Sequence, residues 1–222
     1  MNNKQYKAER LTAVDGMQLT ANMYNLVIGL VLLWGVLINV GMAMFLAPVI
    51  LQANTAVILI LYLAGSIGCM MVVYRSKSPL ISFLGFSGLA ASMGLILTYF
   101  LTTFSGQAVI NAFLMTAIVT FATMLIATIF PATFLKAGRS LCTILLITII
   151  VELLTALIFH VNPVSFDYIV VLIFCGFIGF DWAKAQVYPK TLDNAIDCAA
   201  DIYVDIVNIF IRILDIMGKK NN

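Results

Sequence analysis

Residues 176–217 read GFIGFDWAKAQVYPKTLDNAIDCAADIYVDIVNIFIRILDIM, and they hold six of the ten acidic residues in the 222-residue chain. These acids stand inside apolar runs that have the composition of membrane helices. A carboxylate at the centre of a bilayer costs about 2.5–3.5 kcal/mol on the insertion scale. The segment therefore predicts a final helix that is wrapped by the others, with its carboxylates facing protein or a water-filled path.

The composition of the whole chain supports a membrane protein. It is 63% hydrophobic and only 10% charged, whereas a soluble domain carries roughly 25% charged residues. The net charge of +2 is too small to indicate a nucleic-acid partner. Four cysteines without a C-x-x-C spacing and a single histidine predict no disulfide framework, resident metal or cofactor. We expect an all-α, multi-pass protein embedded in a lipid bilayer.

Seven apolar runs predict seven transmembrane helices with the last one central. Their approximate bounds are 24–47, 56–74, 80–101, 109–130, 141–159, 168–187 and 195–217. Together they form one domain, 23–218, between a polar tail at 1–22 and a short basic tail at 219–222. Pro48 is expected to end the first helix and Pro131 to kink or end the fourth.

Basic residues fall in alternate loops, and this pattern predicts the orientation. The loops around residues 48–55, 102–108 and 160–166 contain no Lys or Arg. The positive-inside rule then places the N-terminus in the cytoplasm. Seven full crossings put Lys219 and Lys220 on the other side, which is a mild conflict. A last helix that crosses only partly and returns is one way to resolve it.

Several acids are expected at similar depths near the predicted cytoplasmic side. Asp181 lies about 10 Å from the end of the sixth helix, while Asp201 and Asp205 lie about 9 Å and about 15 Å into the seventh. Asp197, Asp201 and Asp205 are four residues apart and share one helix face. Two carboxylates held close together in a low-dielectric site share a proton. The cluster is therefore a candidate proton sensor or cation site, and depth alone leaves Asp201 and Asp205 open as the mate of Asp181.

The competing interpretation is structural, with acids paired to cations so as to orient the helices. The available cations are Arg75, Lys184 and Arg212. Asp215, three residues after Arg212, is the expected partner of that arginine. Glu152 stands near the middle of the fifth helix without an evident partner, and its role stays open between function and packing.

The end of the chain resembles a known family. Residues 202–210, IYVDIVNIF, are similar to the signature LYLDIINLF of the Bax inhibitor-1 family, also called the transmembrane Bax inhibitor motif family. Phe180 and Asp181 stand where that family has a Tyr-Asp pair, with Phe180 replacing the tyrosine. Arg75 ends the second helix where the family has basic residues. The resemblance implies seven helices with the last in the middle and, for bacterial members, a pH-sensitive calcium leak in the plasma membrane.

The resemblance also implies roles for individual residues. Asp181 and Asp205 become the paired-aspartate pH sensor and a transient calcium site, and Arg75 becomes the latch that pairs with Asp181 in the closed state. Lys184 is an additional cation one turn from Asp181. The secondary site candidates are Asp201, Asp197, Glu152 and Lys184.

The expected function is a cation leak, for calcium in the first place, that opens on acidification. Carboxylates at 181, 201 and 205, with carbonyls and water, supply the oxygen ligands that calcium prefers. One alternative is a regulator without flux that binds membrane proteases or death-pathway proteins. A minor alternative is an intramembrane aspartyl protease, which also uses acids on a sixth and a seventh helix. Asp205 follows Ile-Tyr-Val rather than the protease's Gly-x-Gly, so no enzymatic activity is expected.

Overall fold

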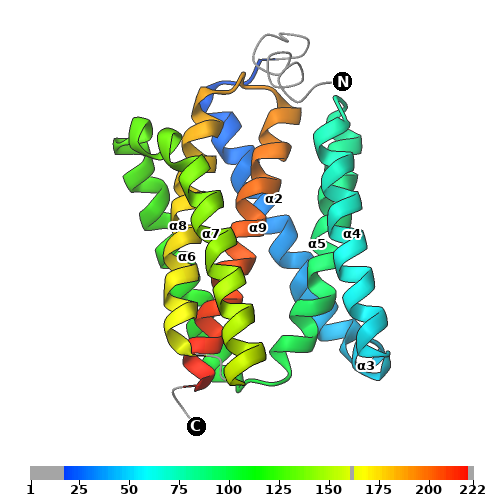
Figure 1. Ribbon diagram of the computed structural model, residues 1–222. Helices are drawn as coiled ribbons and strands as arrows, with labels where there is room; N and C mark the ends of the chain where they lie inside the picture. The colour runs from blue at the N-terminus through cyan, green and yellow to red at the C-terminus, as the bar shows by residue number, and fades with distance from the viewer. Residues whose placement is uncertain (1–17, 161–162, 220–222) are drawn as a thin grey trace. The chain divides into compact units, whose positions relative to one another are not determined.

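The computed structural model describes residues 18–160 and 163–219, and all regular elements in them are helices (Figure 1). The elements are α2 (Ala21–Gly41), η1 (Met42–Leu46), α3 (Ala47–Gln52), α4 (Thr55–Arg75), α5 (Pro79–Leu101), α6 (Gly106–Ile129), α7 (Pro131–Phe159), α8 (Val164–Val187) and α9 (Leu192–Lys219). The first three elements run on as one rod, so the described part of the chain has seven helical rods. Six of these rods are long and apolar enough to cross a membrane. The all-α membrane fold is confirmed, whereas most of the two predicted tails falls on residues 1–17 and 220–222, outside the described residues.

The first predicted helix does not end at Pro48, so that prediction was wrong. The chain stays helical from Ala21 to Gln52, with a π-helical segment at Met42–Leu46. Pro48 lies in the first turn of α3, directly after the π-helical segment, and proline is tolerated in the first turn of an α-helix. The wider π-turn before it changes the spacing of the backbone bonds, and the helix continues past the proline.

Pro131 separates two helices as predicted, because α6 ends at Ile129 and α7 begins at Pro131. The fifth helix nevertheless starts about ten residues earlier than the predicted 141. Proline is favoured at the first position of a helix, and lysine and arginine are good helix formers. Lys136 and Arg139 therefore lie on the helix and not in a loop.

The chain divides into two compact units, each of which takes part of α9. The described part of the first unit comprises 18–99 and 184–203, and that of the second comprises 100–160, 163–183 and 204–219. No residue from 193 to 218 is exposed, so α9 supplies a buried segment to each unit. It is one continuous helix of 28 residues, about 42 Å long. The predicted wrapped helix is confirmed, and a last helix that returns part-way is excluded.

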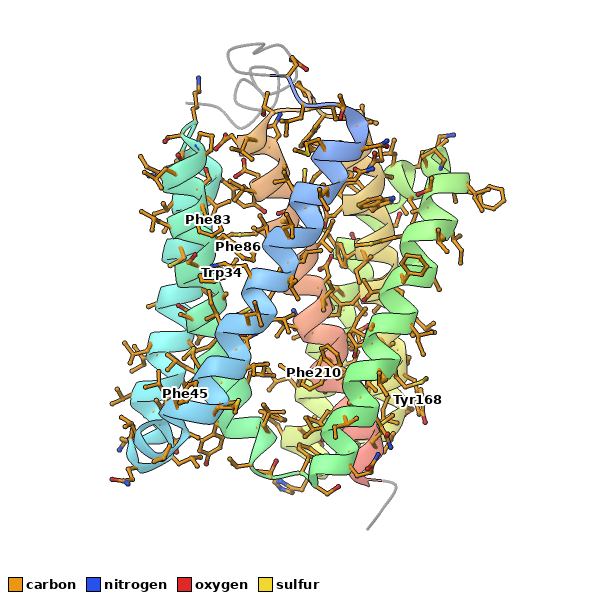
Figure 2. The ribbon with its side chains drawn as sticks, turned by 180° about the vertical axis from the view of Figure 1, so that it is seen from behind. Trp34, Phe45, Phe83, Phe86, Tyr168 and Phe210 are labelled. Atoms are coloured by element: carbon orange, nitrogen blue, oxygen red, sulfur yellow. The ribbon has the colours of Figure 1, made fainter. Side chains whose placement is uncertain are left out.

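Aromatic side chains pack α9 into the first unit. The ring of Tyr203 meets Phe86 edge-on, with centroids 5.3 Å apart, and its hydroxyl accepts a hydrogen bond from the Asn39 amide. Nearby, Trp34 stacks on Phe83 at 6.0 Å (Figure 2). The end of the α9 segment in this unit is therefore fixed to α2 and α5 by rings and by a buried polar contact.

Gly35 on α2 permits this packing and gives a first prediction. A Cβ at position 35 would lie 2.7 Å from Cε2 of Tyr203 and 2.9 Å from Cζ of Phe86. Overpacking of this kind costs about 1–3 kcal/mol, so Gly35→Ala is expected to lower the thermal midpoint of the detergent-solubilised protein. Gly29→Ala on the same helix is the matched control, because its Cβ meets nothing within 4 Å. A midpoint for Gly35→Ala equal to that of the control would contradict the packing argument.

The core of the second unit is apolar and joins α6, α8 and α9. Its fully packed members are Ala108, Ala112, Ile178, Ile209, Ile213 and Leu214. The indole N–H of Trp182 on α8 donates to the hydroxyl of Thr128 on α6 at 2.8 Å. In contrast, α7 buries only Gly138 and Thr148 along its 29 residues. Such a helix has the surface expected of one that faces lipid.

Candidate functional site

Three carboxylates follow one another along α9 at four-residue intervals, and all three are buried. Asp197 and Asp201 belong to the first unit, and Asp205 belongs to the second. Their burial agrees with the single face predicted from their spacing. It also means that each needs partners, because an isolated buried charge is strongly unfavourable.

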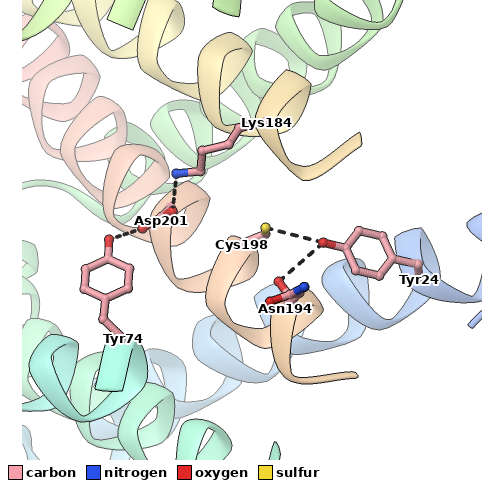
Figure 3. Close-up of polar contacts among 6 residues, drawn as sticks. All are labelled: Tyr24, Tyr74, Lys184, Asn194, Cys198 and Asp201. Carbon is pink, nitrogen blue, oxygen red and sulfur yellow. Dashed lines mark hydrogen bonds and ion pairs between the residues drawn. The ribbon is translucent and has the colours of Figure 1, made fainter. Parts of the chain in front are cut away.

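In the first unit, Asp201 is held by partners from two other helices (Figure 3). Nζ of Lys184 on α8 lies 2.6 Å from Oδ2 of Asp201, and the hydroxyl of Tyr74 on α4 donates to Oδ1. Both oxygens of the carboxylate are thus engaged within this unit. The ion pair with Lys184 joins α9 to α8, and the hydrogen bond from Tyr74 joins α9 to α4.

The start of α9 is fixed by a second group of contacts in the same unit. The hydroxyl of Tyr24 on α2 lies 3.4 Å from the carbonyl oxygen of Asn194 and 3.4 Å from Sγ of Cys198 (Figure 3). Nζ of Lys190, in the turn before α9, sits 4.5 Å from the centroid of the Tyr24 ring. The same ammonium donates to the carbonyl of Ala185 at 2.9 Å, near the end of α8. Burial lowers the pKa of Lys190. The contacts with the ring and with the carbonyl offset part of the cost of removing the charged ammonium from water.

In the second unit, Arg212 on α9 binds two acids from two other helices. Its Nη1 lies 2.6 Å from Oε1 of Glu152 on α7 and 2.9 Å from Oδ1 of Asp167 on α8. Nη2 donates to the other Glu152 oxygen at 3.0 Å, which makes this pair bidentate. The prediction that Asp215 is the partner of Arg212 was wrong, because the guanidinium pairs with Glu152 and Asp167 on neighbouring helices.

Asp167 was given no role by the sequence. It stands in the first turn of α8, where an acid is commonly explained by the helix dipole. Its burial and its bond to Arg212 show a different role. The available signal was an acid and a distant arginine inside two otherwise apolar spans. Glu152, left open by the sequence, now has a structural partner.

Asp181 and Asp205, the candidate sensor pair, lie in the same unit. Asp181 on α8 is 8% exposed and Asp205 on α9 is 6% exposed, and both belong to the second unit. Among the described residues no three His, Cys, Asp or Glu side chains gather closely enough to hold a metal ion. The pairing of the two aspartates stays a prediction.

Arg75, the predicted latch, is the last residue of α4 and is exposed. It lines an open groove of about 770 Å³ in the first unit, together with Ser76, Lys77 and Ser78 from the turn before α5. Its guanidinium is therefore accessible to solvent at the end of its helix.

These features define a multi-pass helical membrane protein with a charged last helix, three of whose acids are buried. Residues 16–222 match the family model described as "Inhibitor of apoptosis-promoting Bax1". The chain belongs to the Bax inhibitor-1 family, as the resemblance in its last helices indicated. Comparisons with curated proteins and with solved structures gave no match.

Proposed function

We propose that this protein is a pH-gated leak for cations, calcium in the first place, with Asp181 and Asp205 as its proton-sensing pair. The observation that carries the proposal is the burial of both carboxylates in one unit, on the neighbouring helices α8 and α9. Intramembrane acids are costly and are retained at ion and proton pathways. Asp201 is engaged by Lys184 and Tyr74 in the other unit, which favours Asp205 as the mate of Asp181.

The proposed gate responds to the number of protons on the pair. Two carboxylates that share a site bind one proton more readily than two separate ones. In this mechanism the ionised Asp181 is held by the latch Arg75 at neutral pH. Acidification protonates Asp181, the attraction to the latch is lost, and calcium passes with the help of carboxylate, carbonyl and water oxygens. We infer a cytoplasmic N-terminus from the distribution of basic loops, and a bacterial plasma membrane from the family resemblance.

Calcium uptake into liposomes that contain only the purified protein tests this function. We expect uptake by the wild type to rise as the pH falls from about 8 to about 5.5, the range over which a shared proton between carboxylates is gained. Asp181→Asn, which cannot change charge, is expected to remove most of this pH dependence.

Other outcomes of the same assay point elsewhere. Flux and pH dependence that are unchanged in Asp181→Asn would refute the sensor. No flux at any pH, from protein shown to be folded, would favour the regulator that acts by binding a membrane protein. Cleavage of a reporter helix that is abolished by Asp205→Ala would instead indicate a protease.

A further inference from the structure

Helix α6 turns one continuous face inward. The buried residues of this helix are Ala108, Ala112, Thr116, Thr120, Thr123 and Ala127, which recur at the three- and four-residue spacing of a single helix face. Its first part is apolar and belongs to the core of the second unit. The three middle positions are all threonines, so the face changes from methyl groups to hydroxyls part-way along.

The threonines begin at the depth of Asp205. Helices α6 and α9 run in opposite directions (Figure 1), because Phe104, just before α6, lies against Gly218 near the end of α9. Ala112 and Ile209 share one apolar cluster. Thr116 follows Ala112 by one turn on α6, and Asp205 precedes Ile209 by one turn on α9. Because the two helices are antiparallel, both steps lead about 6 Å in the same direction from the apolar cluster.

Two contacts relate the second half of α6 to α8. Thr123 interacts with the thiol of Cys175 on α8, and Thr128 binds the indole of Trp182, the residue after Asp181. Helices α6 and α8 therefore run in the same direction, and Asp181 lies beyond Thr123. The hydroxyl face of α6 therefore lies in the same unit as Asp205 and Asp181 and packs toward the helices that carry them.

Thr120, at the centre of this face, has an unsatisfied hydroxyl. It is 8% exposed, and its Oγ1 has no hydrogen-bond partner among the described residues. Thr116 and Thr128 on the same helix each donate to the carbonyl four residues earlier at 2.8 Å. A buried polar group without a partner is unfavourable, because the loss of its hydration is not compensated. An unpaired oxygen such as Oγ1 of Thr120 is suited to binding a ligand transiently.

We propose that the threonine face of α6 is the uncharged wall of the cation path, and that Thr120 lends its hydroxyl oxygen to calcium or to its hydration water beside Asp205. The inference rests on the proposed function and names the ligand class of the same site. Calcium takes six to eight oxygen ligands, and the aspartates supply too few of them. Neutral hydroxyls add ligands without adding charge, and so bind the ion weakly enough to release it.

Thr120→Val tests this role, because valine keeps the shape and removes the oxygen. The calcium concentration for half-maximal flux is expected to rise about tenfold, the equivalent of one lost hydrogen bond to a charged group. Thr120→Ser, which keeps the hydroxyl, is expected to stay close to the wild type. Thr155→Val is the matched control, since Thr155 lies on α7 and donates to the carbonyl of Val151. Thermal unfolding of the same variants, with and without calcium, gives a second readout.

A purely structural threonine predicts the opposite pattern. Replacing an unsatisfied hydroxyl by a methyl group would then raise the thermal midpoint and leave calcium transport unchanged, and this result would overturn the inference. Wild-type protein without any flux would refute the proposed function. In that case the rise in thermal midpoint on adding calcium tests the inference. A rise in the wild type that is lost in Thr120→Val supports it. An equal rise in the wild type and in Thr120→Val, or no rise in either, overturns it.

Discussion

Arg212→Ala is expected to lower the free energy of unfolding by about 3 kcal/mol. The substitution leaves the carboxylates of Glu152 and Asp167 without their shared cation inside the second unit. Removing one partner of a buried ion pair costs about 3–5 kcal/mol. The lower end applies here because the Arg212 side chain is 26% exposed. Thermal or denaturant unfolding of the protein in one detergent measures the change.

Two variants separate the ion cluster from a general loss of charge. Arg139→Ala removes an exposed arginine from α7 and is expected to stay within about 0.5 kcal/mol of the wild type. Adding Glu152→Gln to Arg212→Ala removes one of the two uncompensated charges and is expected to recover part of the loss. Equal stability of Arg212→Ala and Arg139→Ala would show that the cluster contributes nothing to the fold.

Asp205→Asn is expected to flatten the dependence of calcium flux on pH, whereas Asp201→Asn is expected to preserve it. Asparagine has the size of aspartate but carries no titrating proton. At position 205 it removes one member of the proposed sensor pair, so Asp181 has no second carboxylate with which to share a proton over the pH range of the assay. At position 201 it removes the partner of Lys184 in the other unit. The cost there is stability, because the ammonium is left without its carboxylate.

Uptake into liposomes at several pH values, with unfolding measured on the same preparations, distinguishes these two aspartates. The expected result is an altered pH profile with near-normal stability for position 205, and a normal profile with reduced stability for position 201. The reverse assignment, a flat profile only in Asp201→Asn, would make Asp201 the mate of Asp181. Asp193→Asn is a control for the loss of one carboxylate from α9 outside the proposed sensor pair. Asp193, at the start of α9, accepts a hydrogen bond from Ser82, and asparagine keeps an oxygen that can accept it.

Hydropathy was sufficient to predict the fold class, because runs of about 20 apolar residues have few other uses. It failed where helices continue through polar or proline positions. Pro48 and the cations Lys136 and Arg139 looked like ends of spans, yet all three lie within helices. Hydropathy marks the residue at which an apolar run ends, but the backbone hydrogen bonds of the helix can continue beyond that residue.

The site shows a similar division. The spacing along α9 correctly predicted that Asp197, Asp201 and Asp205 would all be buried, since a helix face follows from the local period. The partners were not predictable. Arg212 could be matched only with the nearby Asp215, because the approach of α7 and α8 that delivers Glu152 and Asp167 is a tertiary property. Asp201 likewise acquired Lys184 and Tyr74 through packing that no local pattern encodes.

The burial of α9 among the other helices of its two units has a consequence for biogenesis. This helix is absent from the six that are apolar enough to cross a membrane on their own, and the ribosome makes it after all of them. A nascent segment with buried acids and an arginine gains little by partitioning alone into lipid. Its integration therefore depends on the earlier helices, which act as the solvent for the last one.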